Sequence, residues 1–197
     1  MVKIRREMLH AYIGALRLSF GPTRAPIDDT ELEAFYKARD YNSIVRFVRD
    51  TLKLNLRIRV GLWNGNTPAD IGDAPAWINR PMPLPMRGTR DFKNTLIMVN
   101  FRKSFLQEAT FEQVVLAVAH ELSHVVLDSV GHVLSRHEEA VDLTAMLLGF
   151  RDFYTTGCRT VTQSATSTHV CRLGYLKSEE VRYAAHLMTF GEPPPGF

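Results

Sequence analysis

The chain has 197 residues, of which 45% are hydrophobic and 23% are charged. This is the balance of an ordinary globular protein, and it excludes a chain that is disordered, collagen-like or coiled-coil throughout. Lys and Arg exceed Asp and Glu by 24 to 21. So small an excess argues against a nucleic-acid partner, which needs a clustered basic face.

The first fifty residues are expected to be helical. Apolar side chains at helical spacing predict a helix over residues 4–18, which Gly21-Pro22 ends. A second helix is predicted over residues 28–50, with a break at residues 41–43. No apolar run reaches the roughly 20 residues of a membrane-spanning helix, and the basic start lacks the apolar core of a signal peptide. We therefore expect a cytoplasmic protein without a transmembrane segment.

Two strands follow in the sequence. Alternating apolar residues predict a half-buried strand over residues 54–62, and the apolar run at 95–101 predicts a second strand. Between them, residues 64–91 contain five Pro and three Gly. This composition is typical of a long surface loop rather than of a linker between domains.

The segment after the second strand predicts a buried central helix. Residues 111–128 are apolar on nearly all sides, and Thr110 with Gln113 has the spacing of a capping box. A further helix is expected over residues 135–150, then a Thr- and Ser-rich loop or hairpin over 155–170.

The last predicted helix is capped by Ser178 and lies within residues 175–190. The order of helices, strands and helices predicts an α+β fold. We expect one domain over residues 1–197, with a helical part at 1–50 and a catalytic core at 54–150.

The buried helix carries the chemistry, because residues 120–124 read His-Glu-Leu-Ser-His. His120 and His124 are four residues apart on one helix face, so both imidazoles can bind one Zn²⁺. Glu121 points about 100° away, where it can accept a proton from a zinc-bound water. This is the HExxH arrangement of zinc hydrolases. The alternative is a pair of core histidines beside a surface Glu, although so apolar a helix does not accommodate three polar side chains without partners.

A catalytic zinc needs a third protein ligand and an open position. Glu138 and Asp142 are also four residues apart, so Glu138 can bind the metal while Asp142 accepts a hydrogen bond from a ligating histidine. Glu139 takes the place of Glu138 if the helix register differs, and His132 or His137 can supply a third imidazole. The alternative for the two glutamates is a solvated acidic first turn, which is favourable at a helix N-terminus.

The motifs His120-Glu-Leu-Ser-His124 and Glu138-Glu-Ala-Val-Asp142 resemble those of the gluzincin metallopeptidases. Within this group, the chain is most similar to the ImmA/IrrE-type peptidases and the HtpX-like minigluzincins, over about residues 95–150. It departs from their pattern in having Val141 where Ala is usual, and in a short gap between the motifs. The resemblance implies a zincin-like fold, with a small sheet whose edge strand lies over the central HExxH helix.

The resemblance also implies two further roles. The strand at 95–101 corresponds to the edge strand, which pairs with a peptide substrate in extended form. The alternative for this strand is a core strand, and both can hold for different edges of one strand. A Tyr or His from a late helix stabilises the negatively charged oxygen that forms at the scissile carbonyl. Tyr183 and His186, three residues apart in the last predicted helix, are the candidates. The alternative for them is a packed tyrosine and an exposed histidine.

Cys158 and Cys171 bracket the Thr- and Ser-rich segment. With His169 they offer three zinc ligands, whereas a structural zinc site normally has four. A reducing cytosol argues against a disulfide between them. We therefore expect free, buried cysteines.

The leading hypothesis is a zinc-dependent endopeptidase that cleaves a protein or peptide as a regulatory or processing enzyme. One alternative is a binding module that keeps the metal-binding fold without turnover, and the presence of Glu121 argues against it. Another is a DNA-associated regulatory protein, because Arg57 and Arg59 lie on one face of the first strand. Arginines on one face of a strand usually just face solvent and do not form a binding surface. No pattern in the sequence indicates an oligomeric state.

Overall fold

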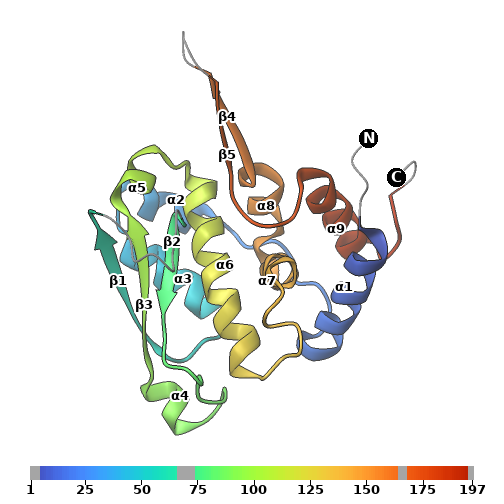
Figure 1. Ribbon diagram of the computed structural model, residues 1–197, viewed down its shortest axis with the longest axis horizontal. Helices are drawn as coiled ribbons and strands as arrows, with labels where there is room; N and C mark the ends of the chain where they lie inside the picture. Colours follow the sequence, from blue (N-terminus) through green and yellow to red (C-terminus); the bar gives the residue numbers. More distant parts are fainter. Residues whose placement is uncertain (1–4, 66–73, 164–167, 195–197) are drawn as a thin grey trace.

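A long apolar helix, α6 (Phe111–Ser129), runs through the middle of the molecule in the computed structural model (Figure 1). The structure describes residues 5–65, 74–163 and 168–194, with the backbone alone for residues 159–163 and 168–172. A three-stranded sheet lies on one side of α6. The helices α1 (Arg6–Phe20), α7 (Glu138–Ala145) and α9 (Ser178–Phe190) lie on the other. The fold is therefore α+β, as predicted.

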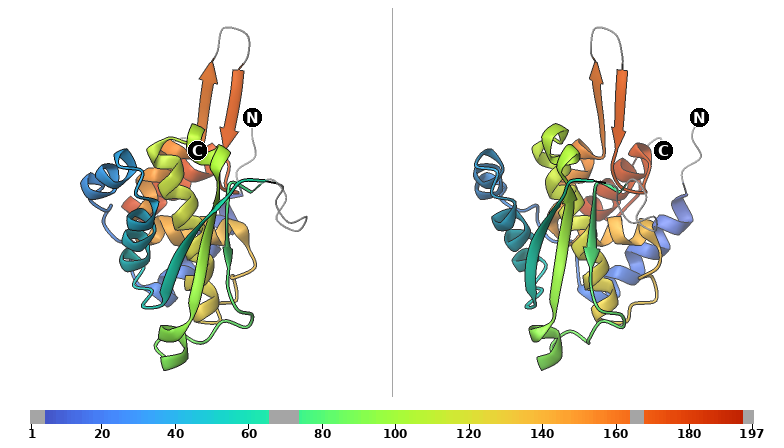
Figure 2. Two further views of the ribbon diagram at one scale, coloured as in Figure 1. Left: turned by 90° about the vertical axis from the view of Figure 1, so that its left-hand side faces the viewer. Right: turned by 60° about the vertical axis from the view of Figure 1, so that its left-hand side comes forward.

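The sheet consists of β1 (Arg57–Trp63), β2 (Ala76–Asn79) and β3 (Leu96–Arg102), in the order β1-β3-β2. β3 pairs in parallel with β1 and antiparallel with β2 (Figure 2). The prediction that the strand at 95–101 is an edge strand is wrong, because β3 is the central strand. The edge strand beside α6 is β2, which lies within the segment predicted to be only a loop; residues 66–73 of that segment lie outside the described part.

The sheet and α6 bury a common apolar layer. Ile97, Val99 and Phe101 of β3 are fully buried, and the helices packed near this layer are α6 and α3 (Tyr41–Thr51). α6 begins with the predicted capping box: the Thr110 amide donates to Gln113 Oε1, and the Gln113 amide donates to Thr110 Oγ1. Because α6 is covered on both sides, most of its side chains are buried and the rest are half-buried, and its position is fixed from two directions.

The remaining N-terminal helices are α1 (Arg6–Phe20) and α2 (Thr30–Lys37). The helix predicted over residues 28–50 is divided into α2 and α3, as expected, but the break lies at residues 38–40. The predicted position at residues 41–43 is wrong, because Asp40 caps a new helix whose first turn these residues form. Two short helices, α4 (Arg90–Asn94) and α5 (Lys103–Glu108), flank β3 and were not predicted. No helix in the described part of the chain is long and apolar enough to cross a membrane.

The helix predicted over residues 135–150 is divided in the structure. α7 (Glu138–Ala145) continues into a π-helical turn, Met146–Phe150, and then into α8 (Arg151–Gly157). Gly149 has a φ of +114°, and a Cβ there would lie 3.1 Å from Ile27 and 3.2 Å from the Ala25 carbonyl oxygen. Glycine is therefore required where the chain bends past the segment that follows α1.

The hairpin expected within residues 155–170 is present. β4 (Arg159–Gln163) and β5 (Thr168–Arg172) pair antiparallel and project from the body of the molecule (Figures 1 and 2). The last helix, α9 (Ser178–Phe190), begins at Ser178, so Ser178 is not its N-cap. At this end of the helix, the Glu180 carboxylate accepts a hydrogen bond from the Lys177 amide, the residue before α9.

A partly buried ion pair joins Arg5, the residue before α1, to this half of the fold. The Arg5 guanidinium donates two hydrogen bonds to the carboxylate of Glu180, whose side chain is fully buried, and a third to Glu139. Burial raises the pKa of Glu180, but its hydrogen bonds with Arg5 outweigh this effect and hold the pKa below its ordinary value. Arg5 thus holds the chain before α1 against both α7 and α9.

We predict that Arg5→Ala lowers the free energy of unfolding by about 1–2 kcal/mol at pH 7, because the buried Glu180 carboxylate loses its cationic partner and keeps the hydrogen bond from the Lys177 amide. The folded-state pKa of Glu180 is lowered, so the pair stabilises the fold above the unfolded-state pKa, which is 4.5. This contribution is lost as the pH falls below that value. Urea unfolding at pH 7 and pH 3 measures the difference.

The matched control is Arg182→Ala, which removes an exposed arginine from the same helix as Glu180. It should change stability by less than about 0.5 kcal/mol. If Arg5→Ala lowers the free energy of unfolding no more than Arg182→Ala does, the ion pair does not stabilise the fold. If the effect of Arg5→Ala is as large at pH 3 as at pH 7, it does not depend on the charge of Glu180.

Candidate metal centre

Helix α6 presents two imidazoles to the same space. His120 and His124 are one turn apart, with ring centroids separated by 5.1 Å and planes at 85°. His120 is buried and His124 is half-buried. Since α6 is anchored on both sides, these rings are held in place before any ligand binds.

Helix α7 supplies the third group. Glu138, its first residue, places Oε2 at 3.3 Å from the Nε2 atoms of both His120 and His124. The three potential ligand atoms lie within 4.8 Å of one another, so this group could hold a metal ion. The chain reaches this position through a tight turn at Gly131, whose φ is +61°.

The other candidates for the third ligand lie elsewhere. The Glu139 carboxylate is bonded to Arg5. The His132 ring stacks on Phe20, and His137 Nδ1 is 3.1 Å from the Tyr12 hydroxyl. Of the alternatives left open by the sequence, the structure brings Glu138 alone to the two histidines.

The electrostatics of this cluster suit a cation. Glu138 Oε2 is buried and has no hydrogen-bond partner in the described structure, although it faces two imidazole nitrogens. Those imidazoles hold the pKa of Glu138 well below its usual range. Burial lowers the pKa of His120, but the carboxylates of Asp142 and Glu138 outweigh it and raise the value to about 10. The cluster therefore favours positive charge between the three groups, which a divalent cation supplies.

Asp142 orients His120, as predicted from its spacing to Glu138. Its carboxylate is fully buried and accepts a hydrogen bond of 2.8 Å from His120 Nδ1. This bond fixes the proton on Nδ1, so that Nε2 presents its lone pair towards Glu138 and His124. The same carboxylate accepts bonds from the Tyr154 hydroxyl and from two backbone amides, those of Tyr175 and Leu176.

Those amides belong to a turn before α9 that sequence reasoning missed. Gly174 has a φ of +82°, and a Cβ there would lie 3.0 Å from Asp142 Oδ2, so the turn needs glycine at this position. The turn lays the ring of Tyr175 on that of His120, with centroids 5.5 Å apart and planes at 21°. Only the glycine marks this turn in the sequence, and it does not indicate that Tyr175 lies against a metal ligand.

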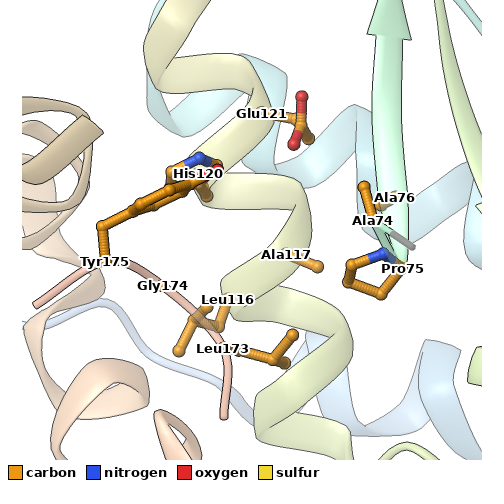
Figure 3. Close-up of a pocket in the computed structure, with 10 residues that line it drawn as sticks. All are labelled: Ala74, Pro75, Ala76, Leu116, Ala117, His120, Glu121, Leu173, Gly174 and Tyr175. Atoms are coloured by element: carbon orange, nitrogen blue, oxygen red, sulfur yellow. The ribbon is translucent and has the colours of Figure 1, made fainter. Parts of the chain in front are cut away.

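Glu121 lies on the side of α6 that faces β2. It lines a pocket of about 190 Å³ between α6, the residues around Ala76, and the turn of Tyr175 (Figure 3). Figure 3 shows Glu121 directed towards β2, whereas His120 is directed towards Tyr175. Burial raises the pKa of the Glu121 carboxyl, partly offset by His120 and His124. Glu121 is thus a carboxyl group with a raised pKa in a pocket beside the His120, His124 and Glu138 cluster.

The structure does not bring Tyr183 and His186 to this cluster. Tyr183 is buried, and its hydroxyl lies 2.9 Å from His10 Nε2 of α1. His186 packs on Phe190, with ring centroids 4.6 Å apart. Neither is among the described residues that line the pocket. The tyrosine beside the cluster is Tyr175.

The second group of potential ligands is described only in part. Cys158 is buried at the end of α8, as expected. The side chains of His169 and Cys171 lie outside the described part, so the state of the two cysteines stays a prediction.

No family model matches this chain, and searches of curated proteins and of solved structures likewise found no match. The resemblance to gluzincins therefore stays a prediction from the two motifs. The metal centre is supported by the geometry of the cluster itself.

We predict that Glu138→Ala abolishes metal binding while Glu139→Ala preserves it. Removing Glu138 leaves two imidazoles, too few to hold a catalytic zinc. Elemental analysis after dialysis should find about one zinc per chain in the wild type and in Glu139→Ala, and little in Glu138→Ala. Equal zinc in all three proteins, or loss only in Glu139→Ala, would show that Glu138 is not the ligand.

Proposed function

We propose that this protein is a zinc-dependent peptidase with a zincin-like catalytic domain. The observation that carries the proposal is the convergence of Glu138 Oε2 on both Nε2 atoms of an HExxH helix. Glu121 of the same motif lies beside this cluster in an open pocket. A purely structural metal site does not need such a carboxylate, so its placement favours catalysis over binding alone.

Two imidazoles and one carboxylate form a donor set that suits zinc and leaves a coordination position open for reaction. A zinc ion held there would act as a Lewis acid, lowering the pKa of a water molecule and polarising the substrate carbonyl. The chain contributes the geometry: Asp142 keeps Nε2 of His120 directed at the ion, and the sheet and helices around α6 exclude bulk water from one side.

Glu121 supplies the acid–base chemistry in this proposal. Its carboxylate accepts a proton from the attacking water and later donates that proton to the leaving amine nitrogen. The raised pKa of Glu121 makes the carboxyl a better proton acceptor than an exposed glutamate. Tyr175, which stacks on His120 and lines the pocket, takes the role predicted for Tyr183 or His186. Its hydroxyl is the nearby neutral donor for the oxygen that becomes negative.

The substrate path follows from the sheet. β2 is an edge strand of the described sheet, and Ala76 at its start lines the pocket that contains Glu121. An extended peptide that adds to this edge by main-chain hydrogen bonds would carry its carbonyl groups past Glu121. β2 thus takes the role that the sequence had suggested for β3. A substrate that binds by pairing with β2 must be extended. This requirement fits a processing or regulatory enzyme that acts on unfolded or extended segments.

We predict that Glu121→Gln keeps zinc and loses peptide hydrolysis, because the amide has the shape of the carboxylate but cannot accept the proton. The rate should fall by at least about 10²–10⁴-fold. Hydrolysis of a mixture of defined peptides, followed by mass spectrometry, measures it, with zinc content determined on the same samples. Glu112→Gln, in the first turn of the same helix, is the matched control and should cleave at the wild-type rate. Undiminished cleavage by Glu121→Gln would contradict the mechanism.

A further inference from the structure

The three-stranded sheet has an exposed face that the candidate metal centre does not use. α3 and α6 both pack on the opposite face, where Ile97, Val99 and Phe101 are buried (Figure 2). Side chains at the alternate strand positions point away from these helices, and we call the surface that they form the outer sheet face. Its described positions are Arg57, Arg59, Gly61 and Trp63 of β1, Leu96, Met98, Asn100 and Arg102 of β3, and Trp77 and Asn79 of β2.

The outer sheet face is positively charged. Arg57 and Arg59 are exposed, and neither forms an ion pair with another residue of the described chain. They are two positions apart on β1, so their side chains start about 6.6 Å apart on the same side. Arg102 adds a third guanidinium, whose Nε donates a hydrogen bond of 2.8 Å to the Ala74 carbonyl oxygen. The described positions of this face include no Asp or Glu, so an anionic partner complements it.

An indole ring lies on the same face as these cations. Trp63 is 42% exposed, and its neighbour across the β1–β3 register is Arg102. The ring of Trp77 supports that of Trp63 edge-on, with centroids 6.1 Å apart and planes at 74°. A ring that is held by a second ring, and that still exposes much of its surface, offers a face on which another planar group can stack.

The middle of the outer sheet face is flat. Gly61 has no side chain, and Asn100 of β3 lies across it, because a Cβ on Gly61 would overlap Asn100 Oδ1. The strip between the arginines and Trp63 is therefore low. A flat strip of this kind accommodates planar bases, whereas an amphipathic helix of a partner protein needs a groove.

We propose that the outer sheet face binds single-stranded nucleic acid. Arg57 and Arg59 each contact a phosphate, and Trp63 stacks on a base. The small net charge of the whole chain does not oppose this, because binding depends on local clustering of charge, and the structure brings three arginines to one face of the sheet. Contacts to phosphates and to the flat sides of bases do not read a sequence, so the binding is general.

The aromatic ring favours a nucleic acid over an acidic peptide. An acidic peptide neutralises the arginines but brings no planar ring to Trp63. A nucleic acid strand satisfies both, since it alternates phosphates with bases, and each base stacked on an aromatic side chain strengthens binding. The two kinds of partner therefore differ in how strongly their binding depends on Trp63.

Fluorescence anisotropy of a labelled oligothymidylate of about 15 nucleotides, within the size range of such sites, measures binding to the full-length protein. We expect a dissociation constant of about 1–100 μM near physiological salt, and tighter binding at lower salt. An oligouridylate of the same length is the second probe, and tighter binding of either one identifies the strand as DNA or RNA. A duplex should bind at least about 10-fold more weakly, because its bases are not free to stack. No binding of either single strand at about 50 mM salt would overturn the proposal.

The arginines are tested by the salt dependence. Arg57→Gln combined with Arg59→Gln should reduce the slope of log K against log salt by about 1.4, because each phosphate contact on a single strand contributes about 0.7. Arg46→Gln combined with Arg182→Gln removes the same charge from exposed positions of α3 and α9 and is the matched control. An equal slope in the two double variants would show that the outer sheet face is not the contact.

The stacking contact is tested separately. Trp63→Ala should weaken binding by about 5–150-fold with little change in the salt slope, and Trp63→Phe should restore most of the affinity. Leu62→Ala, at an exposed neighbour that points to the opposite side of β1, is the matched control. Binding by Trp63→Ala that equals binding by Leu62→Ala would refute the stacking and with it the proposal.

An oligoglutamate of equal charge and phosphatidylserine vesicles are the comparison ligands. Oligoglutamate that binds as tightly as oligothymidylate would show that the face recognises negative charge alone, which would overturn the proposal. Vesicle binding that the two arginine changes abolish, without binding of a single strand, would assign the face to a membrane surface instead. Because none of these residues belongs to the candidate metal centre, either result leaves the proposed peptidase function intact.

Discussion

The buried carboxylate of Asp142 holds the functional half of the molecule together. It accepts hydrogen bonds from His120 on α6, from Tyr154 on α8, and from the amides of Tyr175 and Leu176 before α9. A fully buried charge is costly unless every lone pair is satisfied, so each of these partners is under a strong constraint to remain in place. One side chain of α7, the helix that carries Glu138, is thus linked to α6, to α8 and to the turn that forms part of the pocket wall.

This arrangement explains why the site needs so few residues. Glu138 and Asp142 are one turn apart on α7, so the same short helix places one candidate metal ligand and the carboxylate that orients another, His120. Glu121 and Ala117, which both line the pocket, are likewise one turn apart on α6. The two helices therefore position the cluster, Glu121 and part of the pocket, and the remaining wall comes from the start of β2 and the turn of Gly174.

The parts of the site that could be predicted are those fixed by local spacing. The four-residue intervals between His120 and His124, and between Glu138 and Asp142, place each pair on one helix face whatever the rest of the fold does. The capping box at Thr110 is local in the same way. The parts that were missed depend on pairing between distant segments. β2 has only four residues among prolines, and the central position of β3 follows from its two neighbours rather than from its own sequence.

The prediction of Tyr183 and His186 failed for the same reason, because contacts between distant segments decide which side chains reach the cluster. Tyr183 and His186 have the right spacing to share a helix face, but α9 packs that region of its surface on α1, where Tyr183 meets His10. Tyr175 reaches His120 because its own amide is bonded to Asp142, a contact between residues far apart in the sequence. Spacing within a helix cannot reveal which neighbour that helix will meet.

We propose that His120, His124 and Glu138 bind one zinc ion through two imidazole nitrogens and a carboxylate oxygen. X-ray absorption spectroscopy at the zinc edge of the purified protein measures this coordination. We expect a low-coordinate zinc with two imidazole ligands and oxygen neighbours at about 2.0–2.2 Å, and loss of this spectrum in Glu138→Ala. Sulfur ligands at about 2.3 Å, or a spectrum unchanged by Glu138→Ala, would contradict it.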